Sequence, residues 1–167
     1  MKYIFLSLLT IVAVTSNAQQ SPCNSPHHGD FDFWVGDWVV YHTAADTIVG
    51  YNKVEKILGS CVIQENWRGV GPSRGKSFNT YNTRDSTWNQ VWVDNSGSTF
   101  HFSGRYKDGI LAMKGETIGQ TGNVVLFSLD FHNQEDKGTV NQIWKMSQDN
   151  GSTWNTIFDG TYKPRKE

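Results

Sequence analysis

The sequence lacks three features that would each assign it to a definite class of protein. Beyond residue 18 it has no long apolar run, so we expect no membrane insertion of the mature part. It has no run of basic residues and a formal net charge of −1, so nucleic acid is not an expected partner. Few windows show helical spacing, which excludes a helix-dominated fold.

Patterns for catalysis and metal binding are also scarce. Gly-x-Ser-x-Gly is absent, and no Ser–His–Asp order stands out. His27, His28, Asp30 and Asp32 are close in sequence, but zinc ligands normally come from rigid, spaced elements. We therefore interpret this segment as a solvated strap and expect neither a metal nor a cofactor.

The N-terminus has the pattern of a secretory signal peptide over residues 1–18. Lys2 gives the positive start, and the apolar run from Tyr3 to Val14 is too short to span a bilayer. Ser16-Asn17-Ala18 fits a cleavage site with small residues at both ends. We predict cleavage after Ala18 and export to the periplasm or the extracellular space.

Cysteine occurs only twice, at Cys23 and Cys61. Export exposes thiols to oxidants, so we predict a disulfide that ties an N-terminal strap, residues 19–35, to a strand. The alternative is two independent buried thiols.

The chain beyond residue 30 consists of short β-branched and aromatic runs separated by Gly, Asn, Asp and Ser clusters. These runs predict about ten strands, at 37–43, 48–58, 61–69, 76–82, 87–94, 98–104, 109–116, 122–131, 138–147 and 153–162. The connections are short, and a series of hairpins closes on itself because closure removes the unpaired edges. We therefore expect one all-β domain over residues 36–167, an antiparallel up-and-down barrel.

Residues 147–154, SQDNGSTW, match the Asp-box pattern known from sialidases and other β-propellers. A propeller needs several blades and a longer chain, so we reject a sialidase-like enzyme. We predict a structural hairpin turn in which Asp149 accepts backbone N–H bonds, Gly151 takes a positive φ and Trp154 folds over the turn. Trp88 follows another turn in a similar Ser-Thr-Trp-Asn context.

Gly36-Asp37-Trp38 opens the first predicted strand. A Gly-x-Trp at this place resembles the calycin group, which includes the lipocalins. The resemblance implies that Trp38 plugs the closed end of the barrel and that a basic residue after the last strand covers it. Lys163 or Arg165 would supply that cation–π contact.

Several separated motifs occur in order along the chain, among them SPHHGDFDFWVGDW, NKVEKILGSCVIQENWRG, TWNQVWVDNSGSTFHFSG and QIWKMSQDNGSTWNTIFDGTY. Together they resemble the bacterial domain-of-unknown-function 1579 family. The resemblance implies a lipocalin-like barrel and brings no established activity. His27 and His28 depart from the family's pattern, so no role is carried over to them.

Strand alternation predicts which side chains face the interior. In 61–69 the polar face carries Arg68, so Glu65 should point inside with Trp67; in 138–147 the same argument places Gln142 and Trp144 inside. The facing of 87–94 and 98–104 is ambiguous, and the two similar Trp-after-turn hairpins favour Gln90 and Trp92 inside. The candidate ligand-binding set is Glu65, Trp67, Gln90, Trp92, Asp94, His101, Gln142 and Trp144.

Three classes of function stay open. The seven Trp, six Tyr and nine Phe suit a cavity lined with rings, and hence an exported protein that binds a small molecule. The same cavity suits an enzyme on a ring-containing or sugar-like substrate, with Glu65 as acid–base. A barrel filled by its own aromatic and polar side chains suits a partner-binding protein. Some calycin-like barrels hold haem through one histidine, so haem is kept as an alternative cofactor, with His101 and His132 as candidates.

Overall fold

The computed structural model describes residues 23–166, so the predicted signal peptide over 1–18 lies outside the described residues. The described chain forms ten strands and three short 3-10 helices. The strands are β1 (Gly36–His42), β2 (Thr47–Ile57), β3 (Val62–Gly69), β4 (Arg74–Asn82), β5 (Thr87–Asp94), β6 (Thr99–Lys107), β7 (Ile110–Ile118), β8 (Val124–Gln134), β9 (Thr139–Ser147) and β10 (Asn155–Pro164). The 3-10 helices are η1 (Pro26–Gly29), η2 (Asp32–Trp34) and η3 (Glu135–Lys137).

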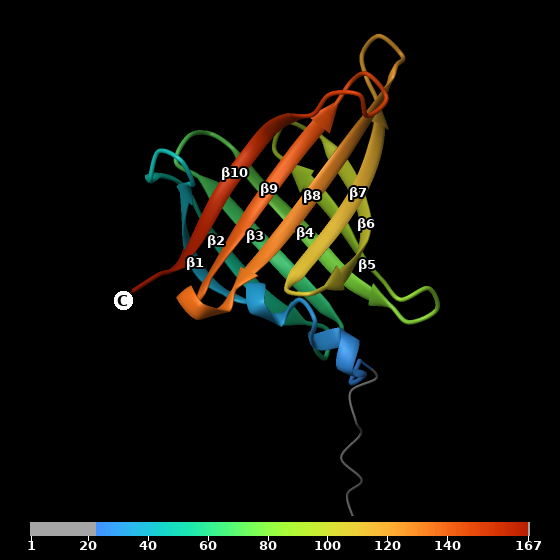
Figure 1. The fold of residues 1–167 in the computed structure, drawn as a ribbon. Helices are drawn as coiled ribbons and strands as arrows, with labels where there is room; N and C mark the ends of the chain where they lie inside the picture. The colour runs from blue at the N-terminus through green and yellow to red at the C-terminus, as the bar shows by residue number, and fades with distance from the viewer. Residues whose placement is uncertain (1–22, 167) are drawn as a thin grey trace, which may run out of the picture.

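The ten strands close into one antiparallel up-and-down barrel (Figure 1). Each strand pairs with its neighbours in the chain, and β1 pairs with β10 to close the seam. The fold prediction is therefore confirmed, and all ten predicted strands are present. The last strand begins at Asn155 rather than at residue 153, because the Asp-box turn occupies the residues before it.

The two ends of the barrel are built differently. We call the end that carries the strap the closed end and the opposite end the open end. At the closed end, the strand connections are 58–61, 83–86, 108–109 and 135–138. At the open end, they are 43–46, 70–73, 95–98, 119–123 and 148–154. The strap and the end of β10 both lie at the closed end, so both ends of the described chain leave the barrel on that side (Figure 1).

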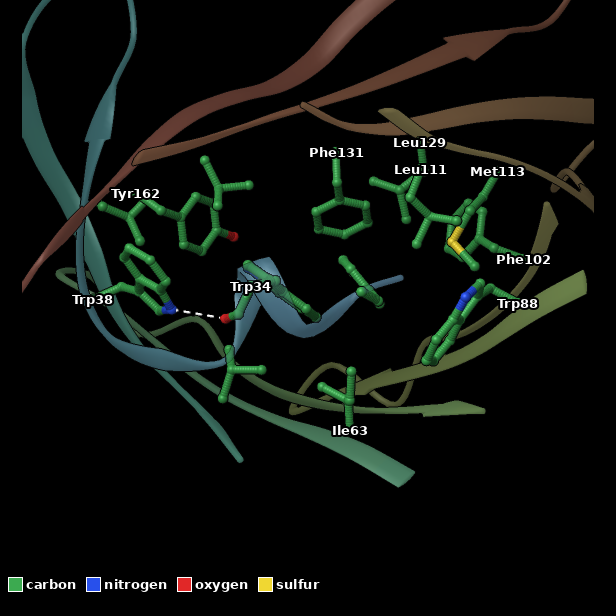
Figure 2. Packing of buried hydrophobic residues seen from close by; sticks show 14 of the residues in the cluster. Trp34, Trp38, Ile63, Trp88, Phe102, Leu111, Met113, Leu129, Phe131 and Tyr162 are labelled. Atoms are coloured by element: carbon green, nitrogen blue, oxygen red, sulfur yellow. Dashed lines mark hydrogen bonds between the residues drawn. The ribbon is translucent and has the colours of Figure 1, made fainter. Parts of the chain in front are cut away.

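An aromatic cluster fills the closed end (Figure 2). Phe31 and Trp34 come from the strap, stack with ring centroids 4.9 Å apart and are 0% exposed. Phe131 of β8 packs against both rings, and Trp88 of β5 meets Phe31 edge-on at 5.6 Å. Burying several large rings makes this end a major part of the hydrophobic core.

Trp38 is a buried member of this cluster, 6% exposed, and meets Tyr162 edge-on. Its Nε1 donates to the carbonyl oxygen of Trp34 at 2.9 Å, as the dashed line in Figure 2 marks. A Cβ on Gly36 would lie 2.9 Å from the Trp38 indole, so the glycine of Gly-x-Trp leaves room for the ring. Trp38 therefore helps to fill the closed end, as the resemblance implies, and shares that place with Phe31 and Trp34 of the strap.

The predicted cation–π contact over Trp38 is wrong. Lys163 Nζ lies 4.2 Å from the ring centroid of Tyr41, and the Arg165 guanidinium lies 5.6 Å from that of Tyr51. Both cations therefore cover half-buried tyrosines on the outside of the barrel, while Trp38 is covered by the strap.

The predicted disulfide is confirmed. Cys23 and Cys61 are bonded, with their Cα atoms 5.1 Å apart. Lys56 Nζ adds an ion pair with Asp32 at 2.7 Å. These two links hold the strap against the β2–β3 hairpin and keep its rings in the aromatic cluster.

The Asp-box forms the structural turn that the sequence predicts. Asp149 Oδ1 accepts the backbone N–H of Thr153 at 2.8 Å, and Gly151 has φ of +88°. Hydrogen bonds to its carboxylate, first those from the side chain and backbone of Thr153 and then that from Ser147, lower the pKa of Asp149 to about 2. Trp154, by contrast, is 41% exposed, so it does not bury itself as Trp88 does.

Within residues 23–166, no helix has both the length and the apolar character needed to cross a membrane.

Candidate functional site

Side chains alternate along the strands between the interior and the outer surface. On β3, Ile63 and Glu65 are buried, whereas Arg68 is exposed. On β5, Trp88 and Gln90 are buried, and Trp92 and Asp94 lie on the same inward face of the strand. Both facings agree with the sequence-based assignment, including the ambiguous one on β5.

A cavity of about 240 Å³ lies inside the barrel, on the open-end side of the aromatic cluster. Its lining includes Ser73 and Ile157, which are exposed, so the cavity reaches the surface near the open end. The barrel is therefore not packed solid, and the filled-barrel hypothesis loses its premise. The lining residues are Glu65, Trp67, Ser73, Gln90, Trp92, Asp94, Phe102, Leu129, Gln142, Trp144, Ile157, Phe158 and Tyr162.

Glu65 is the buried carboxylate of this cavity, with 4% of its surface exposed. Asn52 Nδ2 donates to its Oε1 at 2.7 Å, and Ser77 Oγ donates to its Oε2 at 2.7 Å. Burial raises the pKa of Glu65 to about 7, while the bonds from Ser77 and Asn52 lower it. The carboxyl can therefore gain or lose a proton near neutral pH.

A chain of hydrogen bonds runs along β5 and β4 toward this carboxylate. Gln90 Nε2 donates to Asn79 Oδ1 at 2.8 Å, and Asn79 Nδ2 donates to Ser77 Oγ at 3.0 Å. Ser77 then donates to Glu65, so every donor in the chain points toward the charge. We call this hydrogen-bonded group the polar wall; it comprises Asn52, Glu65, Ser77, Asn79 and Gln90, from strands β2 to β5. Each of these buried side chains has a hydrogen-bond partner within the wall, as burial of polar groups requires.

Rings cover the other side of the interior. Trp144 of β9 meets Phe100 and Phe102 of β6 edge-on, with centroids 5.1 and 5.6 Å apart. Phe127 of β8 packs against the same group, 5.8 Å from Trp144. In the barrel order, β8 and β9 lie across from β3 and β4, so an aromatic wall faces the polar wall.

Two further indoles, those of Trp67 and Trp92, lie nearer the open end, and each packs over a glycine on a neighbouring strand. A Cβ on Gly50 would come within 2.5 Å of Trp67, and a Cβ on Gly75 within 2.2 Å of Trp92. Each glycine sits diagonally across the strand pair from its indole. The missing Cβ atoms let both rings lie against the barrel wall, which leaves the cavity open between them.

Tyr162 of β10 brings a hydroxyl to the same cavity. It donates to Gln142 Oε1 of β9. Burial raises the pKa of Tyr162 well above its usual value, and the Glu65 carboxylate raises it further. Tyr162 therefore stays a neutral hydroxyl at the pH where Glu65 titrates.

The cavity brings together seven of the eight candidate ligand-binding residues, all except His101. His101 is exposed on the outer face of β6, between the inward Phe100 and Phe102, so its placement in the site is wrong. His132 likewise alternates with the buried Phe131 on β8 and faces outward. Both histidines named as candidate haem ligands therefore face away from the cavity.

The direct partners of Glu65 come from outside the candidate ligand-binding set. Asn52 and Ser77 bond its carboxylate directly. Gln90 connects only through Asn79, and Gln142 bonds Tyr162. Alternation on β2 and β4 holds a usable signal, because Asn52 and Ser77 lie in inward register with buried neighbours.

Among residues 23–166, no cluster of His, Cys, Asp and Glu could hold a metal ion. Comparison of the chain with protein-family models and with curated proteins gave no match. The resemblance to the domain-of-unknown-function 1579 family therefore stays a prediction, and the geometry of the cavity is the basis for inferring a function.

Proposed function

We propose that this protein is an exported binding protein for a small organic molecule that combines a flat ring with polar groups. One observation carries the proposal: a cavity of about 240 Å³ in which a hydrogen-bonded polar wall around Glu65 faces an aromatic wall around Trp144. Ring faces hold a flat ligand, and a few fixed polar groups set its orientation.

The cavity volume limits the size of the ligand. An engineered apolar cavity of about 150 Å³ holds benzene, whereas sites for drug-sized ligands span about 300–1,000 Å³. A cavity of about 240 Å³ lies between these, so it suits a molecule of one or two rings.

The disulfide supports the export part of the proposal. Bonds such as Cys23–Cys61 form and persist in oxidising compartments and are rare in the cytosol. The predicted signal peptide over residues 1–18 points to the same compartment.

Native mass spectrometry of protein purified from its own host tests the proposal. We expect a small molecule that stays bound under native conditions and is released on denaturation. Trp67→Leu should lose most of that molecule, because Trp67 lines the cavity. Trp154→Leu is the matched control, since Trp154 is exposed on the Asp-box turn outside the lining. Equal loss in both variants, or no bound molecule in the wild type, would contradict the proposal.

A second candidate is an enzyme that uses Glu65 as its general acid or base. The observation that favours it is a buried carboxyl, with a pKa of about 7, that lines a cavity reaching the surface. Glu65→Gln would then abolish turnover of the molecule found by mass spectrometry while leaving its binding measurable. Unchanged turnover in that variant would rule out this role.

A further inference from the structure

The cavity carries charge of one sign. Among its described lining residues, the charged side chains are the carboxylates of Glu65 and Asp94. Glu65 lies at the polar wall, and Asp94 lies at the end of β5 beside the open end. A ligand inside the barrel therefore meets negative charge both at the wall and on its way in.

The acceptor capacity of Glu65 is only half used. An ionised carboxylate has about four acceptor positions, and here each oxygen accepts one hydrogen bond from the protein. Beside it, Asn52 Oδ1 is buried without a hydrogen-bond partner. A buried acceptor without a partner is unfavourable, because it has lost its hydrogen bonds to water. This part of the polar wall therefore has acceptors to spare, which a ligand with N–H donors would satisfy.

The rings around the cavity also favour a positively charged ligand. Trp67, Trp92 and Trp144 line it together with Phe102 and Phe158. Trp67 meets Phe158 edge-on at 90°, so neighbouring rings offer faces in different directions. Aromatic faces attract cations, and tryptophan attracts them most strongly.

We infer that the ligand is an organic cation, a molecule of one or two flat rings whose protonated amine or amidine donates to Glu65 while its ring contacts the indoles. This inference rests on the proposed binding function and names the ligand class of that same site. Carboxylates alone would also attract an inorganic cation, and rings alone a neutral hydrocarbon; an organic cation uses both.

The inference carries a pH signature. An ionised Glu65 is required for the pair, and burial raises the pKa of Glu65 to about 7. The other titratable groups in the cavity do not change charge between pH 6 and 8. Tyr162 has a pKa well above its usual value, and hydrogen bonds led by those from Ser96 outweigh burial and lower the pKa of Asp94. Asn52 of β2 and Ser77 of β4, which bond Glu65, are neutral, and so is Gln142 of β9, which lines the cavity.

Three isosteric probes test the inference on the wild-type protein: benzamidine as cation, benzamide as neutral molecule and benzoate as anion. Titration by tryptophan fluorescence and calorimetry at pH 8 should show benzamidine binding at least about tenfold more tightly than benzamide, with benzoate weakest. Between pH 6 and 8 the affinity for benzamidine should rise about tenfold, because the ionised fraction of a group with a pKa of 7 rises by that factor. Calorimetry at pH 6 in two buffers of different ionisation enthalpy should show that benzamidine binding releases a proton.

Glu65→Gln should remove the preference for benzamidine and the proton release, while the affinity for benzamide changes less than about twofold. Glu116→Gln is the matched control, because Glu116 is exposed on the outer face of β7. Equal binding of benzamidine and benzamide, or a preference for benzoate, would overturn the cation inference and leave the binding function standing. Binding of none of the three probes would overturn both.

Discussion

The two ends of the barrel use the same residue types for different purposes. At the closed end, Trp34 is 0% exposed and is enclosed by Phe31, Phe131 and Tyr162. At the open end, Trp67 and Trp92 are only partly buried and lie over glycines beside a cavity. A ring that is packed on all sides contributes stability, whereas a ring with one free face can contribute recognition.

The two Trp-after-turn hairpins repeat the contrast on a smaller scale. Trp88 follows the 83–86 turn at the closed end and is 2% exposed, because Phe31 and Tyr81 pack against it. Trp154 follows the Asp-box turn at the open end and is 41% exposed. A similar local sequence thus gives a core residue or a surface residue, depending on what the rest of the chain brings to that end.

Trp34→Ala should have the largest effect on stability. Removing a fully buried indole costs about 3–5 kcal/mol, since the rigid surroundings leave a cavity. Trp92→Ala at the open end should cost clearly less and should instead weaken ligand binding. Urea unfolding of both variants measures the difference, and equal losses of stability would break the comparison between the ends.

The double variant Cys23→Ser/Cys61→Ser should lose nearly as much. Cross-linking residues 38 apart stabilises by about 4 kcal/mol in the chain-entropy model, which is an upper value. The strap would keep its ion pair and ring contacts, so the fold should survive at a lower melting temperature. Thermal unfolding with and without reductant checks this, and a melting temperature that ignores reductant in the wild type would contradict it.

Glu65 makes stability depend on pH. Its folded pKa of about 7 lies above its ordinary value of 4.5, so the folded state binds a proton more tightly than the unfolded state. This contribution is fully present below about pH 4.5 and is lost as pH rises through 7, a change of about 3 kcal/mol. Chemical unfolding of the wild type and of Glu65→Gln should show that fall with pH only in the wild type. Parallel pH profiles would place the titration elsewhere.

Gly75→Ala sharpens the assignment of the open end. The added Cβ would lie 2.2 Å from Trp92 Cζ2, so the indole must turn into the cavity. Overpacking of this kind costs about 1–3 kcal/mol, and the smaller cavity should bind ligand more weakly. Gly71→Ala is the control, because a Cβ added there would meet no atom within 4 Å. Unchanged binding in Gly75→Ala would show that Trp92 does not shape the site.

Gly151→Val should have the smallest effect of the series. Its φ of +88° disfavours a β-branched residue by about 1–2 kcal/mol. Asp149→Ala in the same turn should lower the melting temperature slightly through the lost bonds to Thr153. Neither change should alter ligand affinity, and a loss of affinity at an unchanged melting temperature would assign the Asp-box a role in binding.

Strand alternation and hairpin-length connections are enough to predict the barrel and most of the cavity lining. Glu65 can be placed inside because Arg68 on the alternate face requires water, so alternation along β3 alone is enough to predict its facing. The partners of Glu65 cannot be found in this way, because Asn52 and Ser77 come from two other strands and their contact depends on register. The error at His101 has a related cause: the inward facing of Phe100 on β6 is decided by the aromatic wall that Trp144 brings from β9.

Both ends of the described chain leave the barrel at the closed end, and this has a practical consequence for attaching the protein to a surface (Figure 1). A tag or a fused protein joined next to residue 23 or residue 166 would start on the side opposite the mouth of the cavity. On the proposed binding function, a protein tethered at that end would still exchange its ligand with the surrounding fluid. Biosensors built on either terminus should report the same affinity, set by the barrel and not by the direction of attachment.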